Sequence, residues 1–188
     1  MAVKAQEKML LINGKTIDIN SHSINEEFVF YKRTGDVKNK SRLAEKVDVF
    51  SIQKPDGTEV MIFEADSANG LSIEGVRNYI RGEQAAMRFY REQAHVGESA
   101  ILGMASSLLG FYSFPIPMFN AVVLGRFSPK KMKISEGYDA PYSGTEEYLI
   151  GYQKKARNLK IQQSLKWGYI GLGVGLIAII TYSTTSEK

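Results

Sequence analysis

The chain has 188 residues, a net charge of +4 and no cysteine. The lack of cysteine excludes disulfides, thiol catalysis and cysteine-ligated metals. Charged residues are missing from two long runs, 99–125 and 167–186, whereas residues 1–97 and 126–166 are ordinary charged sequence. An apolar run of about 18 or more residues is long enough to cross the hydrocarbon core of a bilayer as a helix. The sequence therefore predicts an α+β membrane protein with a soluble part and two helical membrane segments.

Residues 1–7 contain the tripeptide Val3-Lys4-Ala5, with small residues at the two positions that a signal peptidase requires. A working signal peptide also needs an apolar region of about 7–15 residues before such a site, and none stands there. We interpret residues 1–7 as the remnant of an export signal, with a coincidental pattern as the alternative.

Residues 8–67 carry the signals of a β-rich soluble head. Apolar and polar residues alternate on both sides of Asn13-Gly14, and this dipeptide is the strongest short hairpin signal. Five strand-like runs at a spacing of about ten residues predict a small antiparallel head, either a meander or an SH3-like barrel. The runs after the hairpin are 28–31, 47–52 and 60–63, with a turn at Pro55-Asp56-Gly57 between the last two.

A connecting helix is predicted over residues 72–96. Ser72 is a suitable N-cap, and Glu74 lies in the first turn, where a negative charge favours the helix dipole. Apolar residues then recur at helical spacing, which predicts packing against the head, with a partner helix as the alternative. These residues are Ile73, Val76, Tyr79, Ile80, Met87, Tyr90 and Ala94.

The first membrane segment, 99–125, contains Pro115 and Pro117. Proline removes a backbone donor and clashes with the preceding turn, so a helix must kink or end there. One shape is a kinked helix that crosses the membrane. The other is a pair of half-length helices that dip in and return on the same side, with their backbone buried by protein. The segment is only modestly longer than one span, which favours the kinked crossing.

Small residues recur every four places in both membrane segments. Such rows let helix backbones approach closely, and in lipid this close packing drives helix association. Glycine is also frequent in membrane helices without any such role, but the number of rows favours tight packing, either within one chain or between copies. The predicted helix-packing residues are Ser99, Gly103, Ser107, Gly110, Ala121, Gly125, Gly171 and Gly175.

The segment 126–166, a basic loop followed by an amphipathic helix, has nine basic and four acidic residues, a net charge of 9 − 4 = +5. Because membrane segments flank it, we expect it to contact anionic lipid headgroups rather than nucleic acid. The second membrane segment follows at 167–183, with a short tail at 184–188. In an inner membrane, the positive-inside rule would put this basic segment in the cytoplasm and the head in the periplasm, whereas in an outer membrane the rule has no force. The predicted headgroup and interface residues are Lys130, Lys131, Lys154, Lys155, Arg157, Lys160, Lys166 and Trp167.

Residues for chemistry are few. The only histidines, His22 and His95, have no second ligand at metal-binding spacing, so exposed side chains are the simpler interpretation. Glu26 and Glu27 are sequence neighbours that face apart in a strand, and we interpret them as solvated surface. Glu98, at the mouth of the first membrane segment, is the ionisable residue of most interest there, and solvation at the interface is its simpler interpretation. We predict no enzyme activity, no cofactor and no metal, and the sequence identifies no small-molecule substrate.

Several short motifs resemble a group of uncharacterised envelope membrane proteins of Bacteroidota. The resemblance implies a β-rich head, a glycine-rich membrane segment with central prolines, and a last span. It implies an envelope location and a cleaved export signal, but no reaction. The motifs are Val47-Asp-Val-Phe-Ser-Ile52, Asp56-Gly-Thr-Glu59, Glu64-Ala-Asp-Ser67, Tyr79-Ile-Arg-Gly-Glu-Gln84 and Gly151-Tyr-Gln-Lys-Lys-Ala156.

These features predict a non-enzymatic integral membrane protein of the bacterial cell envelope. We expect it to act as a scaffold or accessory subunit, in a homo-oligomer or a larger membrane complex held by small-residue helix packing. The alternative is a small channel or transport component, in which the break at Pro115 and Pro117, with Asn120, lines a path.

Overall fold

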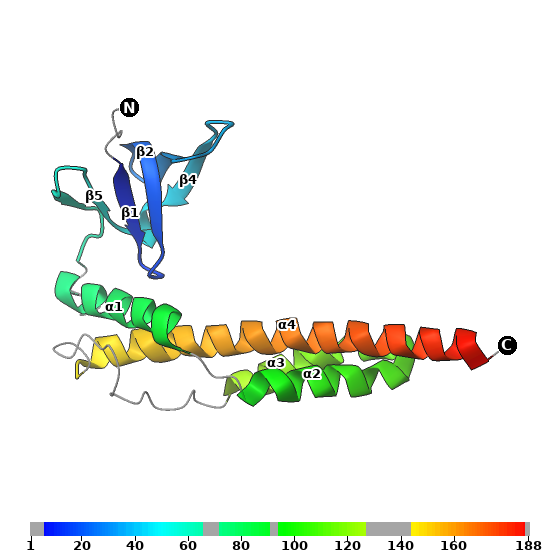
Figure 1. The fold of residues 1–188 in the computed structure, drawn as a ribbon. Coiled ribbons are helices and arrows are strands. Elements are labelled where there is room, and N and C mark those ends of the chain that lie inside the picture. The colour runs from blue at the N-terminus through cyan, green and yellow to red at the C-terminus, as the bar shows by residue number, and fades with distance from the viewer. Residues whose placement is uncertain (1–5, 66–71, 91–93, 127–143, 187–188) are drawn as a thin grey trace. The chain divides into compact units, whose positions relative to one another are not determined.

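The structure is a computed structural model that describes residues 6–65, 72–90, 94–126 and 144–186 (Figure 1). The described chain divides into two compact units. The first unit holds the strands, α1 (Ile73–Phe89) up to Gln84 and the start of α4 (Glu146–Ser186) up to Gly151. The second unit holds the end of α1, α2 (Ala94–Ser106), α3 (Ile116–Arg126) and the rest of α4. Residues 1–5 of the expected export-signal remnant lie outside the described residues, and Glu7 already belongs to the first strand.

The head is one open antiparallel sheet with the strand order β4-β3-β2-β1-β5-β6. The first four strands follow one another as a meander, and β5 then joins the sheet on the other side of β1. β4 and β6 are the two edges, so the sheet is a meander-like open sheet and not the closed barrel of the other expectation. The strands are β1 (Glu7–Leu11), β2 (Thr16–Ile24), β3 (Phe28–Arg33), β4 (Ser41–Glu45), β5 (Val49–Gln53) and β6 (Glu59–Met61).

The two turns predicted from glycine are confirmed. Gly14 has a φ of 76° in the β1–β2 hairpin and Gly57 a φ of 87° in the β5–β6 turn, values that glycine adopts without a steric cost. One strand, β4, was not predicted. Its side chains are mostly exposed, because β4 is an edge strand, and Leu43 in its centre pairs with the partly exposed Phe30. An exposed edge strand does not need the alternation of apolar and polar residues by which buried strands are recognised.

Both faces of the sheet bury apolar side chains. One face carries a core that includes Met9, Ile19 and Ile52. On the other face, Phe50 of β5 packs with Val76 and Ile80 of α1. The small head therefore gains a second apolar layer from the helix that follows it, as the helical spacing predicted.

The start of α1 is as predicted, but its end is not. Gly75 donates its backbone N–H to Ser72 Oγ at 3.0 Å, so Ser72 caps the helix. The single helix expected over 72–96 is two helices, because α1 ends at Phe89 and α2 begins at Ala94. The physical reason for two helices is that α1 and α2 bury different faces. α1 has one apolar stripe that faces the sheet, whereas α2 is apolar on most sides.

An ion pair ties α1 to the sheet. Arg77 of α1 donates to Glu59 of β6 at 2.9 Å, and its guanidinium lies 5.3 Å from the ring centre of Phe50. Ser51 donates to the other oxygen of Glu59 at 2.6 Å. Partial burial raises the pKa of Glu59, but the hydrogen bonds from Ser51 and Arg77 and the charge of Arg77 outweigh it and hold the pKa below its ordinary value.

Replacing this carboxylate should therefore cost stability in a pH-dependent way. A lowered pKa means that the ion pair stabilises the fold fully above the pKa of an unfolded glutamate and loses its effect as the pH falls through the folded value. We expect Glu59→Gln to lower the free energy of unfolding by about 0.5–1 kcal/mol at pH 7 and by much less near pH 3. Thermal unfolding of the full chain in non-ionic detergent, monitored by circular dichroism, measures the loss at each pH. Arg77→Gln should reproduce the effect, and equal stability of Glu59→Gln and the parent at pH 7 would contradict the role of the pair.

Candidate functional site

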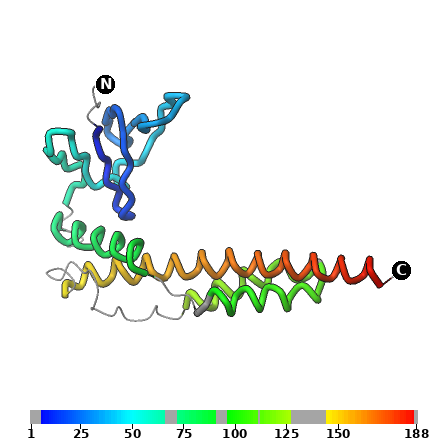
Figure 2. Tube along the Cα trace, viewed as in Figure 1, coloured from blue at the N-terminus to red at the C-terminus, as the bar shows by residue number. Residues whose placement is uncertain are grey.

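The second unit is a helical hairpin packed along α4. α2 runs beside α4 in the same direction, because Ser99 meets Ser164 and Ser107 meets Gly175. α3 runs back, because Pro117 meets Gly168 and Gly125 meets Ile161. Figure 2 shows the chain reverse between the two helices. The short helix η3 (Ser107–Ser113) connects them and is interrupted at Gly110, which has a φ of 58°.

This reversal corrects the expected kinked crossing. The segment 99–125 returns to the level at which it began, as in the alternative of two half-length helices. The prolines do not interrupt a helix. Pro115 lies directly before α3 and Pro117 is the second residue of α3, where the first N–H groups of a helix have no partner within it and proline removes nothing. The left-handed backbone at Gly110 makes the turn, and only glycine adopts it without strain.

Glycines at the helix contacts let the backbones meet within one chain. A Cβ added to Gly103 would overlap the carbonyl oxygen of Gly168, and one added to Gly171 would overlap the carbonyl oxygen of Ala100. On Gly175 it would lie 2.8 Å from the carbonyl oxygen of Met104. In the structure, Gly103, Gly171 and Gly175 are therefore in close contact within one chain. Gly110 differs, because an added Cβ would meet nothing within 4 Å and its role is the turn.

α3 packs on α4 through small residues as well. A Cβ on Gly168 would lie 2.9 Å from Cβ of Pro117, and one on Gly125 would lie 2.5 Å from Cδ1 of Ile161. Ala121, between these contacts in the sequence, is buried. α2 and α3 thus approach the same stretch of α4, with Gly168 in contact with both.

A buried polar seam joins the three helices. The hydroxyl groups of Ser99 on α2 and Ser164 on α4 are 2.8 Å apart, and both residues are buried. Asn120 of α3 donates to Ser99 Oγ at 3.2 Å. A buried hydroxyl without a partner is costly, so this chain of hydrogen bonds stabilises one alignment of the helices. Other serines bond to their own helix, as Ser106 does to the carbonyl oxygen of Gly103 at 2.7 Å.

The outer faces of the same helices are apolar and exposed. α4 is the one described helix that is long and apolar enough to cross a membrane, and 28% of its apolar window is buried. α2 and α3 are shorter apolar helices. The exposed large apolar side chains include Ile101, Leu108, Leu109, Met118, Phe119, Val122, Ile177 and Ile180.

The predicted headgroup residues differ in their exposure. Lys130 and Lys131 lie outside the described residues. Lys154, Arg157, Lys166 and Trp167 are exposed on α4, Lys155 is half-buried, and the ammonium of Lys166 lies 6.0 Å from the ring centre of Trp167.

Lys160 does not fit this expectation. It is 4% exposed, so it does not lie on the exposed basic face. The reason is its position: Lys160 is one turn from Ala156 and one turn from Ser164, and both are buried. The basic composition of this helix did not reveal which of its lysines faces inward.

The histidines do not form a reactive site among the described side chains. His22 Nδ1 lies 2.7 Å from Oε2 of Glu7, and both side chains are partly buried, so His22 is paired rather than freely exposed. The side chain of His95 lies outside the described residues. Within the described ranges, no group of three or more His, Cys, Asp or Glu residues is placed to hold a metal ion.

Sequence reasoning missed a cleft in the head. Three segments far apart in the chain line it: residues 26–28, residues 45–47 and residues 62–64. Its volume is about 550 Å³. We call it the head cleft. Glu26 and Glu27 are exposed, as expected of solvated surface, and both also line the head cleft.

The glycine contacts can be tested with a minimal substitution. We expect Gly171→Ala to lower the free energy of unfolding by about 1–3 kcal/mol, because its Cβ must displace the backbone of α2. Gly173→Ala is the matched control, since its Cβ meets nothing within 4 Å and alanine favours the helix by up to about 1 kcal/mol. Thermal unfolding in non-ionic detergent, with hydrogen exchange of α2 as a local readout, measures the difference. Equal behaviour of the two variants would rule out close packing at Gly171.

Comparisons with known proteins identify no relative. The chain matches no protein-family model, no curated protein and no solved structure. The similarity to Bacteroidota envelope proteins therefore stays a prediction, and the function has to be argued from the hairpin on α4 and from the head.

Proposed function

We propose that the protein is a non-enzymatic membrane-anchored accessory or scaffold subunit, with α4 and the α2–α3 hairpin as its anchor and the head as its partner-binding part. The observation that carries the proposal is the distribution of side chains in the second unit. Glycine, serine and asparagine face inward, whereas large apolar side chains face outward. A protein in water has the opposite distribution, and a helical bundle in lipid has this one.

The dimensions of α4 support a span. Its uncharged part, 167–186, is about 30 Å long as a helix, which equals the thickness of the hydrocarbon core. Trp167 and Tyr182 lie near the two ends of this part, where aromatic side chains favour the membrane interface. A buried core helix of a water-soluble protein is the competing explanation for such a helix. The exposure of Ile177 and Ile180 argues against it.

The returning hairpin changes the expected sidedness. A periplasmic head and a cytoplasmic basic segment require one crossing between residues 98 and 126. A hairpin that returns makes none, so on this proposal the head and the basic segment share one side of the membrane and α4 makes the single crossing. The envelope location implied by the sequence resemblance is kept as part of the proposal. In an inner membrane, the positive-inside rule would then favour the cytoplasm for both parts.

The surface available for assembly also changes. We expected chains to associate through their rows of small residues. In this proposal those rows are not available for contact with another chain, because Gly103, Gly171 and Gly175 are already in contact within the chain. Contact with another membrane subunit would use the outer faces, where residues such as Leu108 and Phe119 are exposed. The residues of the channel alternative are also in packing contacts: Pro117 lies against Gly168 and Asn120 bonds to Ser99. Their contacts favour the anchor over the channel.

Sidedness can be measured with single cysteines, because the chain has no cysteine of its own. The exposed residues Val37 in the head, Asn158 on α4 and Ser186 at its end are each replaced by cysteine. In sealed vesicles treated with a membrane-impermeant maleimide, we expect Val37→Cys and Asn158→Cys to be labelled to the same fraction and Ser186→Cys to the complementary fraction. Complementary labelling of Val37→Cys and Asn158→Cys would show a crossing between them and contradict the hairpin.

The subunit role requires a measurement of assembly. We expect the tagged full chain, extracted from its native membranes in mild detergent, to appear in native mass spectrometry at a fixed mass above that of the monomer. A mass that includes other chains supports an accessory subunit, and a homo-oligomer of defined size supports a self-scaffold. Recovery as a monomer alone, in detergents that keep other complexes intact, would contradict both forms of the proposal.

A further inference from the structure

The head cleft has an apolar floor that is open to solvent. Phe28, Ile62 and Phe63 line it, and Val47 at its edge is 71% exposed. Its volume of about 550 Å³ lies within the usual range for ligand sites, about 300–1,000 Å³. An exposed valine beside half-buried aromatic rings is a surface that gains free energy when an apolar group covers it.

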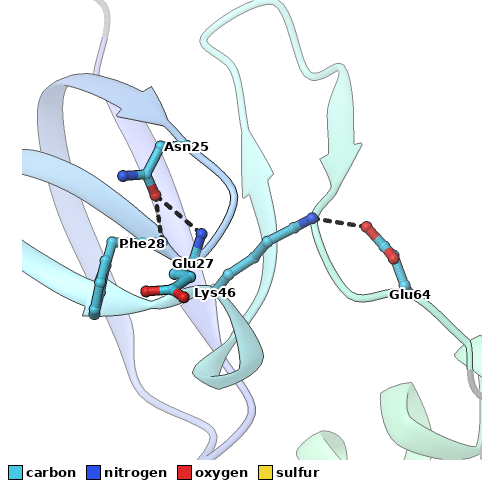
Figure 3. A network of polar contacts seen from close by, with 5 residues as sticks. All are labelled: Asn25, Glu27, Phe28, Lys46 and Glu64. Carbon is cyan, nitrogen blue, oxygen red and sulfur yellow. Dashed lines mark hydrogen bonds and ion pairs between the residues drawn. The ribbon is translucent and has the colours of Figure 1, made fainter.

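The rim of the head cleft is acidic. Glu26, Glu27, Glu45 and Glu64 surround it with one cation, Lys46, for a net charge of 1 − 4 = −3. Lys46 Nζ bonds to Oε1 of Glu64 at 2.7 Å (Figure 3). Within the part of the chain that the structure describes, no ion pair involves the other three carboxylates.

Lys46 shows what kind of group fits. Lys46 belongs to the lining, and its ammonium reaches Glu64, as Figure 3 shows. The backbone around it is fixed, because Lys46 donates its N–H to the carbonyl oxygen of Glu27 at 2.8 Å. Asn25 Oδ1 accepts from the N–H of Glu27 at 3.1 Å and of Phe28 at 2.6 Å, which holds the opposite wall. The head cleft therefore already accommodates one alkyl chain that ends in a cation, that of Lys46, beside three further carboxylates.

We propose that the head cleft binds a cationic segment of a partner protein, in which a lysine or arginine stands beside an apolar residue. The alkyl stem and the apolar neighbour would cover Val47 and Phe63, and the cationic group would reach Glu27 and Glu45. Charge complementarity carries the choice of partner. A net charge of −3 repels nucleic acid and anionic lipid and attracts a basic peptide. The inference rests on the proposed function for the existence of a partner and names its chemistry.

The test uses the full chain in nanodiscs of phosphatidylcholine, a lipid without net charge, and a fluorescein-labelled peptide of alternating lysine and valine as the probe. Binding is measured by fluorescence anisotropy. We expect Glu27→Gln/Glu45→Gln to weaken binding about 3- to 10-fold, as removal of two exposed charge contacts does. The matched control Asp18→Asn/Glu74→Gln removes the same charge from exposed positions that do not line the cleft and should weaken it less than about 2-fold.

Lys46→Gln changes the affinity in the opposite direction. It releases Glu64 and makes the net charge of the rim more negative, from −3 to −4, so the peptide should bind about 2- to 5-fold more tightly. A misfolded head cannot produce this gain, so the prediction does not depend on the stability of the double variant. Equal weakening in the cleft variant and its control, or unchanged affinity in Lys46→Gln, would overturn the proposal.

Two further outcomes separate this inference from others. Displacement of the peptide by spermidine at equal concentration would make the head cleft a site for small cations and overturn the protein partner. Tighter binding of a glutamate–valine peptide would overturn the charge argument. The anisotropy assay does not depend on how the chain crosses the membrane, and the cysteine labelling does not depend on the cleft. Failure of one therefore leaves the other standing.

Discussion

The structure depends on close backbone contact at glycines along α4. Gly151 meets the backbone of Tyr79 in the first unit, and Gly168, Gly171 and Gly175 meet the hairpin in the second. If the second unit lies in lipid, as proposed, the hydrophobic effect does not hold its helices together, so van der Waals contact at short distance has to do so, with hydrogen bonds such as Ser99 to Ser164. A side chain at any of these positions would hold the helices apart. The hairpin, the polar seam and the outward apolar surface all follow from this contact.

The head was largely predictable because its signals are local. Alternation around Asn13-Gly14 and the turn at Asp56-Gly57 both act through residues that are neighbours in the chain, and the structure has a hairpin and a turn there. β4 escaped prediction because an edge strand has one partner and exposed side chains, so burial imposes no pattern on it. The head cleft could not be predicted at all. Its three segments come together only through the curvature and order of the whole sheet.

The hairpin shows where composition misleads. Two prolines in an apolar run are a strong signal, but proline at the start of a helix and proline in its interior look the same in a sequence. The signal that decides is Gly110, and its left-handed backbone is visible only in the structure. The buried position of Lys160 has the same origin. It lies beside residues of α4 that contact the hairpin, Ser164 with Ser99 of α2 and Ile161 with Gly125 of α3, and these contacts are visible only in the structure.

The unequal lengths of the helices in the second unit would give the proposed anchor an asymmetric shape. α2 accompanies α4 from Ser164 to Gly175, and from Ile177 to Ser186 every side chain of α4 is exposed. In a bilayer, α2, α3 and α4 would together occupy the leaflet that the hairpin enters, and α4 alone would occupy the opposite leaflet. Such an anchor is a wedge: it takes the place of more lipid on one side than on the other. A wedge spreads the headgroups of one leaflet, so curved membrane with the wide end on its convex face would hold this protein at a lower elastic cost than flat membrane.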